Sequence, residues 1–258
     1  MLFLMYHELW LPGRAPCRSE PGYLRYVVSV SDFEQQMRWL KNSGWSGVAV
    51  TEALSFPSRP CIALTFDDGS ETDLLAAAPI LEELGFGATF FITSGFLNSA
   101  GHLSSRQLRQ LADRGFEVGC HSMTHSYLPR LDASGLRREM VDAKRQIEDV
   151  IGQAVSHFSC PGGRYDQRVI NMARRTGYRT LSTSRNHPNS AATDVYRLGR
   201  VGILRHTSFA AFQDICRGKG LWRMRMAELA RTGMQRVLGD PAYDALRAYL
   251  LGRHHPFS

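Results

Sequence analysis

The chain of 258 residues is poor in cysteine, and its five cysteines stand far apart in the sequence. No two of them form a Cys-x-x-Cys pair, so neither a disulfide framework nor a cysteine-rich zinc site is predicted. No apolar run reaches the ~18 residues of a membrane-spanning helix, and the N-terminal run lacks the basic start and the length of an export signal. We therefore expect a cytoplasmic protein of a reducing compartment.

Acidic residues are also in the minority, 24 against 31 Lys and Arg, which gives a formal charge of +7. Residues 217–258 hold eight basic and three acidic side chains, and so carry five of these seven charges. Nucleic-acid binding is nevertheless not expected, because the basic residues do not alternate with aromatic ones as on a base-stacking platform. This concentration of charge predicts a separate role for the last 42 residues.

Residues 217–258 fit a basic amphipathic helix that ends near Gly239 and Pro241, followed by a short helix from Ala242 to Leu250. The apolar side chains near one face of the first helix are Trp222, Met226, Leu229, Met234 and Val237. Such a face favours packing on the protein's own domain or on a second copy in a homo-oligomer. The alternative is a peripheral contact with an anionic inner-membrane surface.

No Gly-x-Gly-x-x-Gly follows the first apolar run, which argues against a dinucleotide-binding fold. Strand-like and helix-like segments instead alternate along the chain. After the apolar run at 1–5, buried strands are predicted at 61–66, 87–93, 116–120, 155–160, 178–183 and 196–204. Helices are predicted from Ser31 to Gly44 and at 74–85, 104–114, 133–151 and 167–176. This alternation predicts an α/β fold with parallel strands and outer helices, either a barrel or a doubly wound sheet.

Three polar stretches stand where predicted strands pass into loops: TFDDGS (65–70), CHSMTH (120–125) and CPGGRYD (160–166). In parallel α/β folds, catalytic groups collect at these carboxyl ends of the strands. Asp67 and Asp68 have an ordinary interpretation as a turn or a helix cap. Two adjacent carboxylates in a cleft, however, resist joint ionisation unless a cation lies near them, which favours a functional role.

His121 and His125 are four residues apart. On a helical turn such side chains share a face, so both imidazoles can reach one metal ion. With a strand-end aspartate as the third ligand, they would form the open three-ligand set of a catalytic metal site. The fourth position would then be free for water.

In this order and spacing, TFDDGS, HSMTH and CPGGRYD resemble the first three motifs of the polysaccharide deacetylase family, the NodB-homology or carbohydrate esterase 4 domains. The resemblance covers about residues 1–215. It implies a distorted (β/α) barrel of about seven parallel strands. The domains expected are a catalytic domain at 1–216 and a helical C-terminal extension at 217–258.

The resemblance also implies roles for individual residues. Asp67 would be the general base, and Asp68, His121 and His125 would bind a divalent metal, usually zinc, with cobalt, nickel or manganese as alternatives. The metal would lower the pKa of a bound water that attacks the amide carbonyl, while the base takes its proton. The backbone N–H of Gly162, after Pro161, would stabilise the oxyanion.

Supporting residues are less well defined by the sequence. Ser122 and Thr124 are candidates to brace the two histidines. Many members of the family orient the catalytic aspartate with an arginine two residues before the proline of the third motif, where this chain has Ser159. Arg164 and Arg200 are the candidates to replace it.

Candidates for the general acid stand late in the sequence and at the end of the first predicted strand. Leu204-Arg205-His206 fits the family's late Leu-x-His motif, although it lies in a basic, turn-like context, and His187 is a looser candidate. Leu4-Met5-Tyr6-His7 matches the first strand of a subgroup that resembles the poly-N-acetylglucosamine deacetylases, in which the acid comes from that strand. First and last strands are neighbours when a barrel closes, so we prefer His7 and keep His206 as the alternative.

The expected function is therefore metal-dependent removal of N-acetyl groups from amino sugars of a polysaccharide, an oligosaccharide or a lipid-linked glycan intermediate of the cell envelope. The same chemistry would serve an O-acetyl esterase. A non-catalytic carbohydrate-binding or scaffold protein is the alternative from another class.

Overall fold

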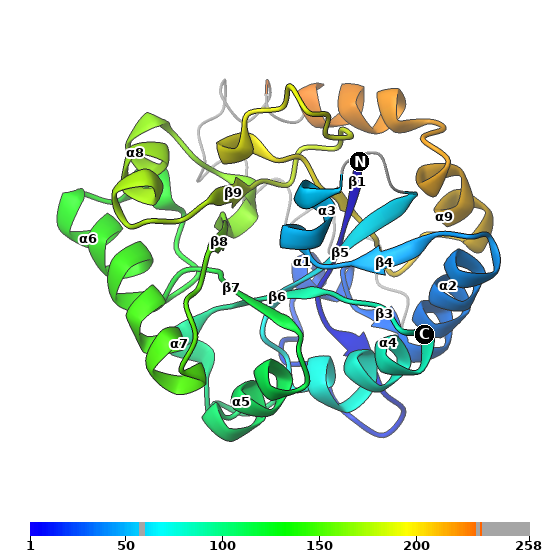
Figure 1. The fold of residues 1–258 in the computed structure, drawn as a ribbon, viewed down its shortest axis with the longest axis horizontal. Helices are drawn as coiled ribbons and strands as arrows, with labels where there is room; N and C mark the ends of the chain where they lie inside the picture. Colours follow the sequence, from blue (N-terminus) through cyan, green and yellow to red (C-terminus); the bar gives the residue numbers. More distant parts are fainter. Residues whose placement is uncertain (57–59, 231–232, 234–258) are drawn as a thin grey trace.

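The structure, a computed structural model, describes residues 1–56, 60–230 and 233 (Figure 1). An eight-stranded parallel sheet curls through its centre, with helices outside it. Seven strands follow one another in the order β10-β1-β5-β6-β7-β8-β9, and β4 pairs with the first half of β5. The strands are β1 Leu2–Tyr6, β4 Ser46–Val48, β5 Cys61–Asp68, β6 Thr89–Ile92, β7 Glu117–Cys120, β8 His157–Ser159, β9 Thr180–Ser182 and β10 Val201–Gly202.

The two edges of this sheet meet through one short segment. Leu198 pairs with Ser182 of β9, and Val201 of β10 pairs with Leu4 of β1. The predicted (β/α) barrel of about seven parallel strands is thus confirmed. Strands β2 Leu9–Trp10 and β3 Val28–Ser29 form a separate two-stranded sheet.

The outer layer consists of short helices. They are α1 Pro21–Leu24, α2 Val30–Asn42, α3 Val50–Ser55, α4 Ala78–Leu84, α5 Ser105–Asp113, α6 Ala133–Arg137, α7 Ala143–Ile151, α8 Gln167–Arg175 and α9 Phe209–Cys216. π-helical turns η1 Asp73–Ala77 and η4 Arg138–Asp142 precede α4 and α7, so the single helix predicted at 133–151 is divided. 3-10 turns are η2 Ser94–Phe96, η3 Leu128–Arg130, η5 Pro161–Gly163 and η6 Val195–Arg197.

Helix starts follow the capping chemistry of the sequence. Ser104 accepts a hydrogen bond from the Gln107 N–H, and the Gln107 side chain accepts one from the Ser104 N–H, which completes the capping box of α5. The predicted cap at Ser31 is wrong by two residues. Ser29 caps α2 instead, because its hydroxyl accepts the N–H of Asp32.

Side chains alternate between two apolar environments along the strands. Leu4 of β1 and Leu64 of β5 pack with the helices in the large outer cluster, whereas Phe3 and Ala63 belong to a second cluster with Phe91. Because strand side chains alternate with a period of two, the second set faces the barrel interior. On β5 the interior set continues with Thr65 and Asp67, and beyond the end of β1 it continues with His7.

A helix at 221–230 follows α9. Its predicted apolar face does not pack on the domain: Trp222, Met226 and Leu229 are 66%, 58% and 51% exposed. Leu221 is the buried residue of this stretch, because it joins the outer core. Met234, Val237 and the helix predicted from Ala242 to Leu250 lie outside the described residues. No helix among the described residues is long and apolar enough to cross a bilayer.

Candidate active site

The predicted metal ligands meet at the carboxyl end of the barrel. Asp68 ends β5, and His121 directly follows β7, four residues before His125. One ligand atom from each of the three lies within 4.8 Å of the others. The Asp68 Oδ1 atom is 3.5 Å from the Nε2 atom of each histidine. Two ligands of a tetrahedral zinc ion, each about 2.1 Å from the metal, stand at about this separation.

The chemistry of these donors fits a divalent cation. Asp68 Oδ1 is buried and accepts no hydrogen bond from any residue that the structure describes. His121 Nδ1 lies 2.9 Å from the Ser159 carbonyl, which can only accept, so Nδ1 carries the proton and Nε2 offers its lone pair. Burial lowers the pKa of His121 to about 4, which keeps the ring neutral as a ligand must be.

The backbone at the site adopts a conformation that side chains rarely take. Asp68, Ser122 and His125 have φ values of 81°, 70° and 60°, and they are three of the four described non-glycine residues with positive φ. The helical turn predicted for HSMTH is therefore wrong. The histidines meet because the loop after β7 reverses at two left-handed residues, and such strain persists where surrounding contacts fix it.

Glu139 of η4 is one source of these contacts, and the sequence analysis missed it. Its buried carboxylate accepts the N–H groups of Met123 and Thr124 at 2.9 and 2.8 Å, and the Thr124 hydroxyl at 2.7 Å. Thr124 thus braces the loop rather than a histidine ring. Ser122 accepts the N–H of His125 at 3.0 Å, so its support also acts on the backbone. Within its run of alternating charges, nothing in the sequence distinguishes Glu139 from exposed neighbours.

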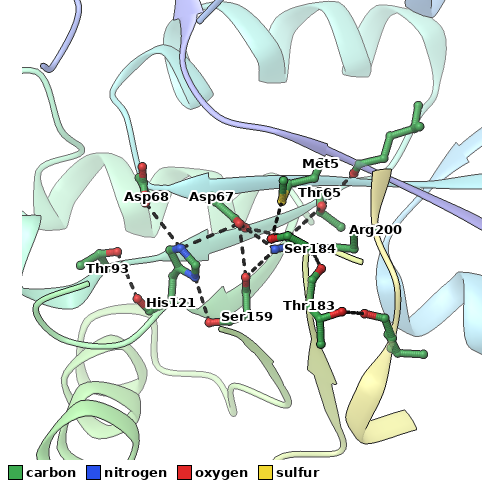
Figure 2. A network of polar contacts seen from close by, with 12 residues as sticks. Met5, Thr65, Asp67, Asp68, Thr93, His121, Ser159, Thr183, Ser184 and Arg200 are labelled. Carbon is green, nitrogen blue, oxygen red and sulfur yellow. Dashed lines mark hydrogen bonds and ion pairs between the residues drawn. The ribbon is translucent and has the colours of Figure 1, made fainter. Parts of the chain in front are cut away.

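Arg200, which directly precedes β10, holds Asp67 of β5 in a fixed orientation, as Figure 2 shows. The fully buried guanidinium donates to both carboxylate oxygens of Asp67 at 2.7 Å. It also donates to the Ser159 hydroxyl at 2.7 Å, to the Thr183 carbonyl at 3.0 Å and to the Thr65 hydroxyl at 3.1 Å. Ser159 in turn donates to Asp67 at 3.3 Å. The small side chain at 159 thus allows an arginine that precedes β10 to reach the aspartate.

These charges keep both aspartates ionised. Burial would raise the pKa of Asp67, but the Arg200 guanidinium, which donates to both carboxylate oxygens, holds it well below its usual range. Burial likewise acts to raise the pKa of Asp68, and His125 reverses the effect, so that the pKa is lowered. Asp67 is therefore available as a proton acceptor at neutral pH.

The loop after β8 borders the site. Pro161 is buried, and Gly162 is exposed with φ of 60°. A Cβ atom at Gly162 would lie 2.9 Å from Cε1 of Tyr127, so this position requires glycine. The Arg164 guanidinium stacks 3.7 Å from the Tyr127 ring centre, and the contacts to Asp67 come from Arg200.

The structure separates the candidates for the general acid. His7 is half-buried beside the site: its ring stacks 4.5 Å from Tyr26, and its buried Nδ1 has no hydrogen-bond partner among the described residues. Burial lowers the pKa of His7, and the nearby Asp68 and Asp67 oppose this effect. His206 lies in an exposed turn. The ring of His187 covers Gly199, where a Cβ would be 2.7 Å away, so it packs beside the segment that carries Arg200.

Comparison with known proteins identifies relatives of this chain. The sequence profile described as "Polysaccharide deacetylase" matches residues 56–181. "Putative polysaccharide deacetylase YxkH" of Bacillus subtilis (strain 168) is 30% identical over 217 residues, 81% of this chain and 73% of the relative. The "Peptidoglycan-N-acetylglucosamine deacetylase" of Bacillus cereus is 29% identical to this chain. The match covers 46% of this chain and 54% of that relative.

Solved structures extend the likeness to nearly the whole described barrel. The structure titled "Streptococcus pyogenes deacetylase PplD in complex with acetate" superposes with a TM-score of 0.73 at 25% identity, and covers 84% of this chain and 97% of its own. IcaB from Ammonifex degensii shares the fold with a TM-score of 0.66 at 22% identity, over 84% of this chain and 95% of its own. Together with the YxkH match, these findings show that the chain belongs to the polysaccharide deacetylase family, hydrolases of N-acetyl amide bonds.

Proposed function

We propose that this protein removes N-acetyl groups from amino sugars of a glycan, with Asp67 as general base and His7 as general acid. The observation that carries the proposal is the arrangement of Asp67 beside an Asp68–His121–His125 cluster whose donor atoms lie within 4.8 Å. A carboxylate held ionised by Arg200 next to three convergent metal donors suits hydrolysis of an amide.

Asp68, His121 and His125 would hold the divalent cation, with zinc as the leading candidate for this set of one oxygen and two nitrogen donors. Bound there, the cation would supply Lewis-acid activation of the attacking water and of the acetyl carbonyl. Buried Asp68 Oδ1 accepts no hydrogen bond from the described part of the chain, which supports this assignment because burial of such an atom without a donor is unfavourable.

The remaining steps belong to the protein's own groups. Asp67 takes the proton of the attacking water, and the Arg200 fork keeps its oxygens in place. The backbone N–H of Gly162 donates to the carbonyl oxygen as negative charge develops on it. His7 gives a proton to the departing amine nitrogen, which leaves as the C–N bond breaks. Acetate and a free amino sugar are the products.

Acetate release from N-acetylated and from O-acetylated oligosaccharides tests the proposal. We expect release from the N-acetyl substrates, with a loss of at least about 10³-fold in kcat for Asp67→Asn. Arg145→Gln, an exposed change on α7, serves as the matched control and should keep wild-type activity. Release from the O-acetyl set alone, or unchanged activity of Asp67→Asn, contradicts the assignment.

We also propose that the helix at 221–230 contacts an anionic phospholipid surface. Trp222, Met226 and Leu229 recur at helical spacing and are more than half exposed, next to Arg223 and Arg225. A basic helix with an apolar face suits the interface of an anionic membrane. The intact chain should float with vesicles that contain phosphatidylglycerol, and Trp222→Glu with Met226→Glu should abolish flotation.

Val195→Glu is the matched control, because Val195 is 40% exposed on η6 and should not affect binding. Failure of the wild-type chain to float, or equal loss with the control, refutes this contact.

A further inference from the structure

Tyr127 lies where two loops of the candidate active site meet. It follows His125 by two residues, and its ring packs against Gly162 in the loop after β8. A Cβ atom at Gly162 would stand 2.9, 3.6 and 3.9 Å from the Cε1, Cδ1 and Cζ atoms of Tyr127. The edge of the ring therefore occupies the space that a side chain at position 162 would take. Tyr127 is half-buried and Gly162 is exposed, so a ligand can reach both.

The surrounding contacts fix the position of this ring. The Arg164 guanidinium lies 3.7 Å from the ring centre of Tyr127, within the distance of about 6 Å at which a cation and a ring attract each other. Arg168 of α8 holds the turn that follows, because it donates to the carbonyl groups of Pro129 and Leu131 at 2.7 and 2.9 Å. A ring held in this way cannot easily move aside for a larger ligand.

The strand order separates Tyr127 from His7 at the mouth of the barrel. His7 directly follows β1, Tyr127 comes after β7 and Gly162 after β8, and β5 and β6 lie between β1 and β7 in the sheet (Figure 1). The nitrogen and the acyl chain of an amide leave the carbonyl carbon in different directions. With the nitrogen toward His7 and the carbonyl oxygen on the Gly162 N–H, the acyl chain extends on the side of Tyr127.

We propose that Tyr127 determines acyl-group specificity, because its ring forms the wall of the acyl pocket and limits the acyl group to acetyl; this rests on the deacetylase function proposed above. In a pocket with fixed walls, the ring leaves no room for a longer chain. One methylene group more or less in an apolar pocket changes kcat/KM by about 10- to 200-fold.

One trisaccharide of amino sugars, prepared with N-acetyl, N-propionyl or N-butyryl groups, tests this pocket in the wild-type protein. All three substrates yield the same free amine, so amine formation gives kcat/KM on one scale. We expect kcat/KM for the propionyl substrate to be at least about tenfold below that for the acetyl substrate, and the butyryl substrate to be lower again. Equal values for acetyl and propionyl overturn the inference.

Substitutions at Tyr127 test whether its ring sets this preference. Tyr127→Ala should raise the ratio of propionyl to acetyl kcat/KM at least about tenfold. Tyr127→Leu keeps an apolar side chain on Gly162 and should raise the ratio at least about threefold, which retains the test if the alanine variant does not fold. Tyr127→Phe keeps the ring and should change the ratio less than about twofold. An unchanged ratio in the folded variants that lack the ring, or an equal rise in Tyr127→Phe, overturns the inference.

Tyr196 on η6 provides a matched control. It is also half-buried beneath an arginine, with the Arg174 guanidinium 4.7 Å from its ring centre. Its hydroxyl donates to the carbonyl of Tyr178, which precedes β9 and so lies at the other end of the barrel. Tyr196→Ala should leave the ratio within about twofold of wild type. A rise equal to that of Tyr127→Ala would mean that any loosening of the fold changes the ratio, and would overturn the inference.

The same measurements separate this inference from the proposed function. Amine release with no preference for acetyl contradicts the role of Tyr127 and leaves the proposed function standing. Absence of amine release from all three substrates contradicts the proposed function instead.

Discussion

Both ends of the barrel interior hold histidine and carboxylate side chains, but the two ends differ in how completely these side chains are hydrogen-bonded. At the amino-terminal end, His157 of β8 lies 3.3 Å from the Glu117 carboxylate and 2.8 Å from the hydroxyls of Thr51 and Thr180. Thr89 donates to Glu117 at 2.5 Å. All the polar side-chain atoms of His157 and Glu117 thus have partners. At the other end, Asp68 Oδ1 and His7 Nδ1 are buried without a hydrogen-bond partner among the described residues.

Between the two ends, Phe3, Ala63 and Phe91 fill the interior, and Gly119 leaves room for the Phe91 ring. Backbone strain follows the same division, because positive φ occurs at Asp68, Ser122 and His125 and not at His157 or Glu117. A histidine–carboxylate pair that is fully hydrogen-bonded and has an unstrained backbone stabilises a fold. A pair that lacks hydrogen-bond partners and has a strained backbone is available to a ligand. Residue type alone would not have distinguished them.

Among the substitutions that compare the two ends of the barrel, His7→Ala should have the largest effect. His7→Ala should lower kcat by about 10²- to 10⁴-fold, the usual contribution of a general acid, with metal content unchanged. His206→Ala, on the exposed turn, should change kcat less than about twofold. Steady-state acetate release and metal analysis of both variants provide the check. A large loss in His206→Ala with an active His7→Ala would mean that the first strand does not supply the acid.

A smaller effect is expected from Arg200, because it acts through Asp67. Arg200→Gln removes the cation that lowers the pKa of Asp67, so this pKa should rise and the acidic limb of kcat/KM should move to higher pH. Arg200→Lys keeps the charge but loses the fork, so kcat should fall about 10- to 100-fold with little movement of that limb. Identical pH profiles for wild type and Arg200→Gln would contradict the role given to Arg200.

The pair at the amino-terminal end should affect stability instead of catalysis. Burial raises the pKa of Glu117, but the hydrogen bond and charge of His157 outweigh this and lower the pKa to about 2 from its ordinary value of 4.5. Glu117 therefore contributes stability above about pH 4.5 that is lost as the pH falls toward 2, on the order of 3 kcal/mol in full.

Glu117→Gln should accordingly lower the free energy of unfolding at pH 7 and weaken its dependence on pH between about 4.5 and 2. Acetate release at pH 7 should change less than about threefold. Denaturant unfolding across this pH range measures the first effect. Wild-type stability in Glu117→Gln, or a large loss of acetate release in this variant, would contradict the prediction that the amino-terminal pair affects stability and not catalysis.

Much of the catalytic end was predictable because it is local in sequence. Asp67 and Asp68 follow one apolar run, and the CHSMTH motif follows another. The sequence alone therefore predicts that these residues lie at the ends of strands. The partner of Asp67 could not be identified from the sequence, because Arg200 is distant in sequence. Arg200 reaches Asp67 only when the barrel closes through Leu198 and β10. The sequence offers Arg164 and Arg200 as equal candidates, and the structure separates them by their contacts: Arg200 donates to Asp67, whereas the Arg164 guanidinium lies over the Tyr127 ring. Glu139 could not be predicted, because its burial depends on the packing of η4 against the loop that carries His121 and His125.

We propose that the Asp68–His121–His125 cluster binds a metal ion and that the Glu117–His157 pair does not. Calorimetric titration of metal-free protein with zinc distinguishes the two. We expect one equivalent of zinc to bind to wild type and to His157→Gln, and none to bind to His121→Ala or to His125→Ala. Retention of that equivalent in His121→Ala, or its loss in His157→Gln with the fold intact by circular dichroism, would show that the cluster is not the metal site.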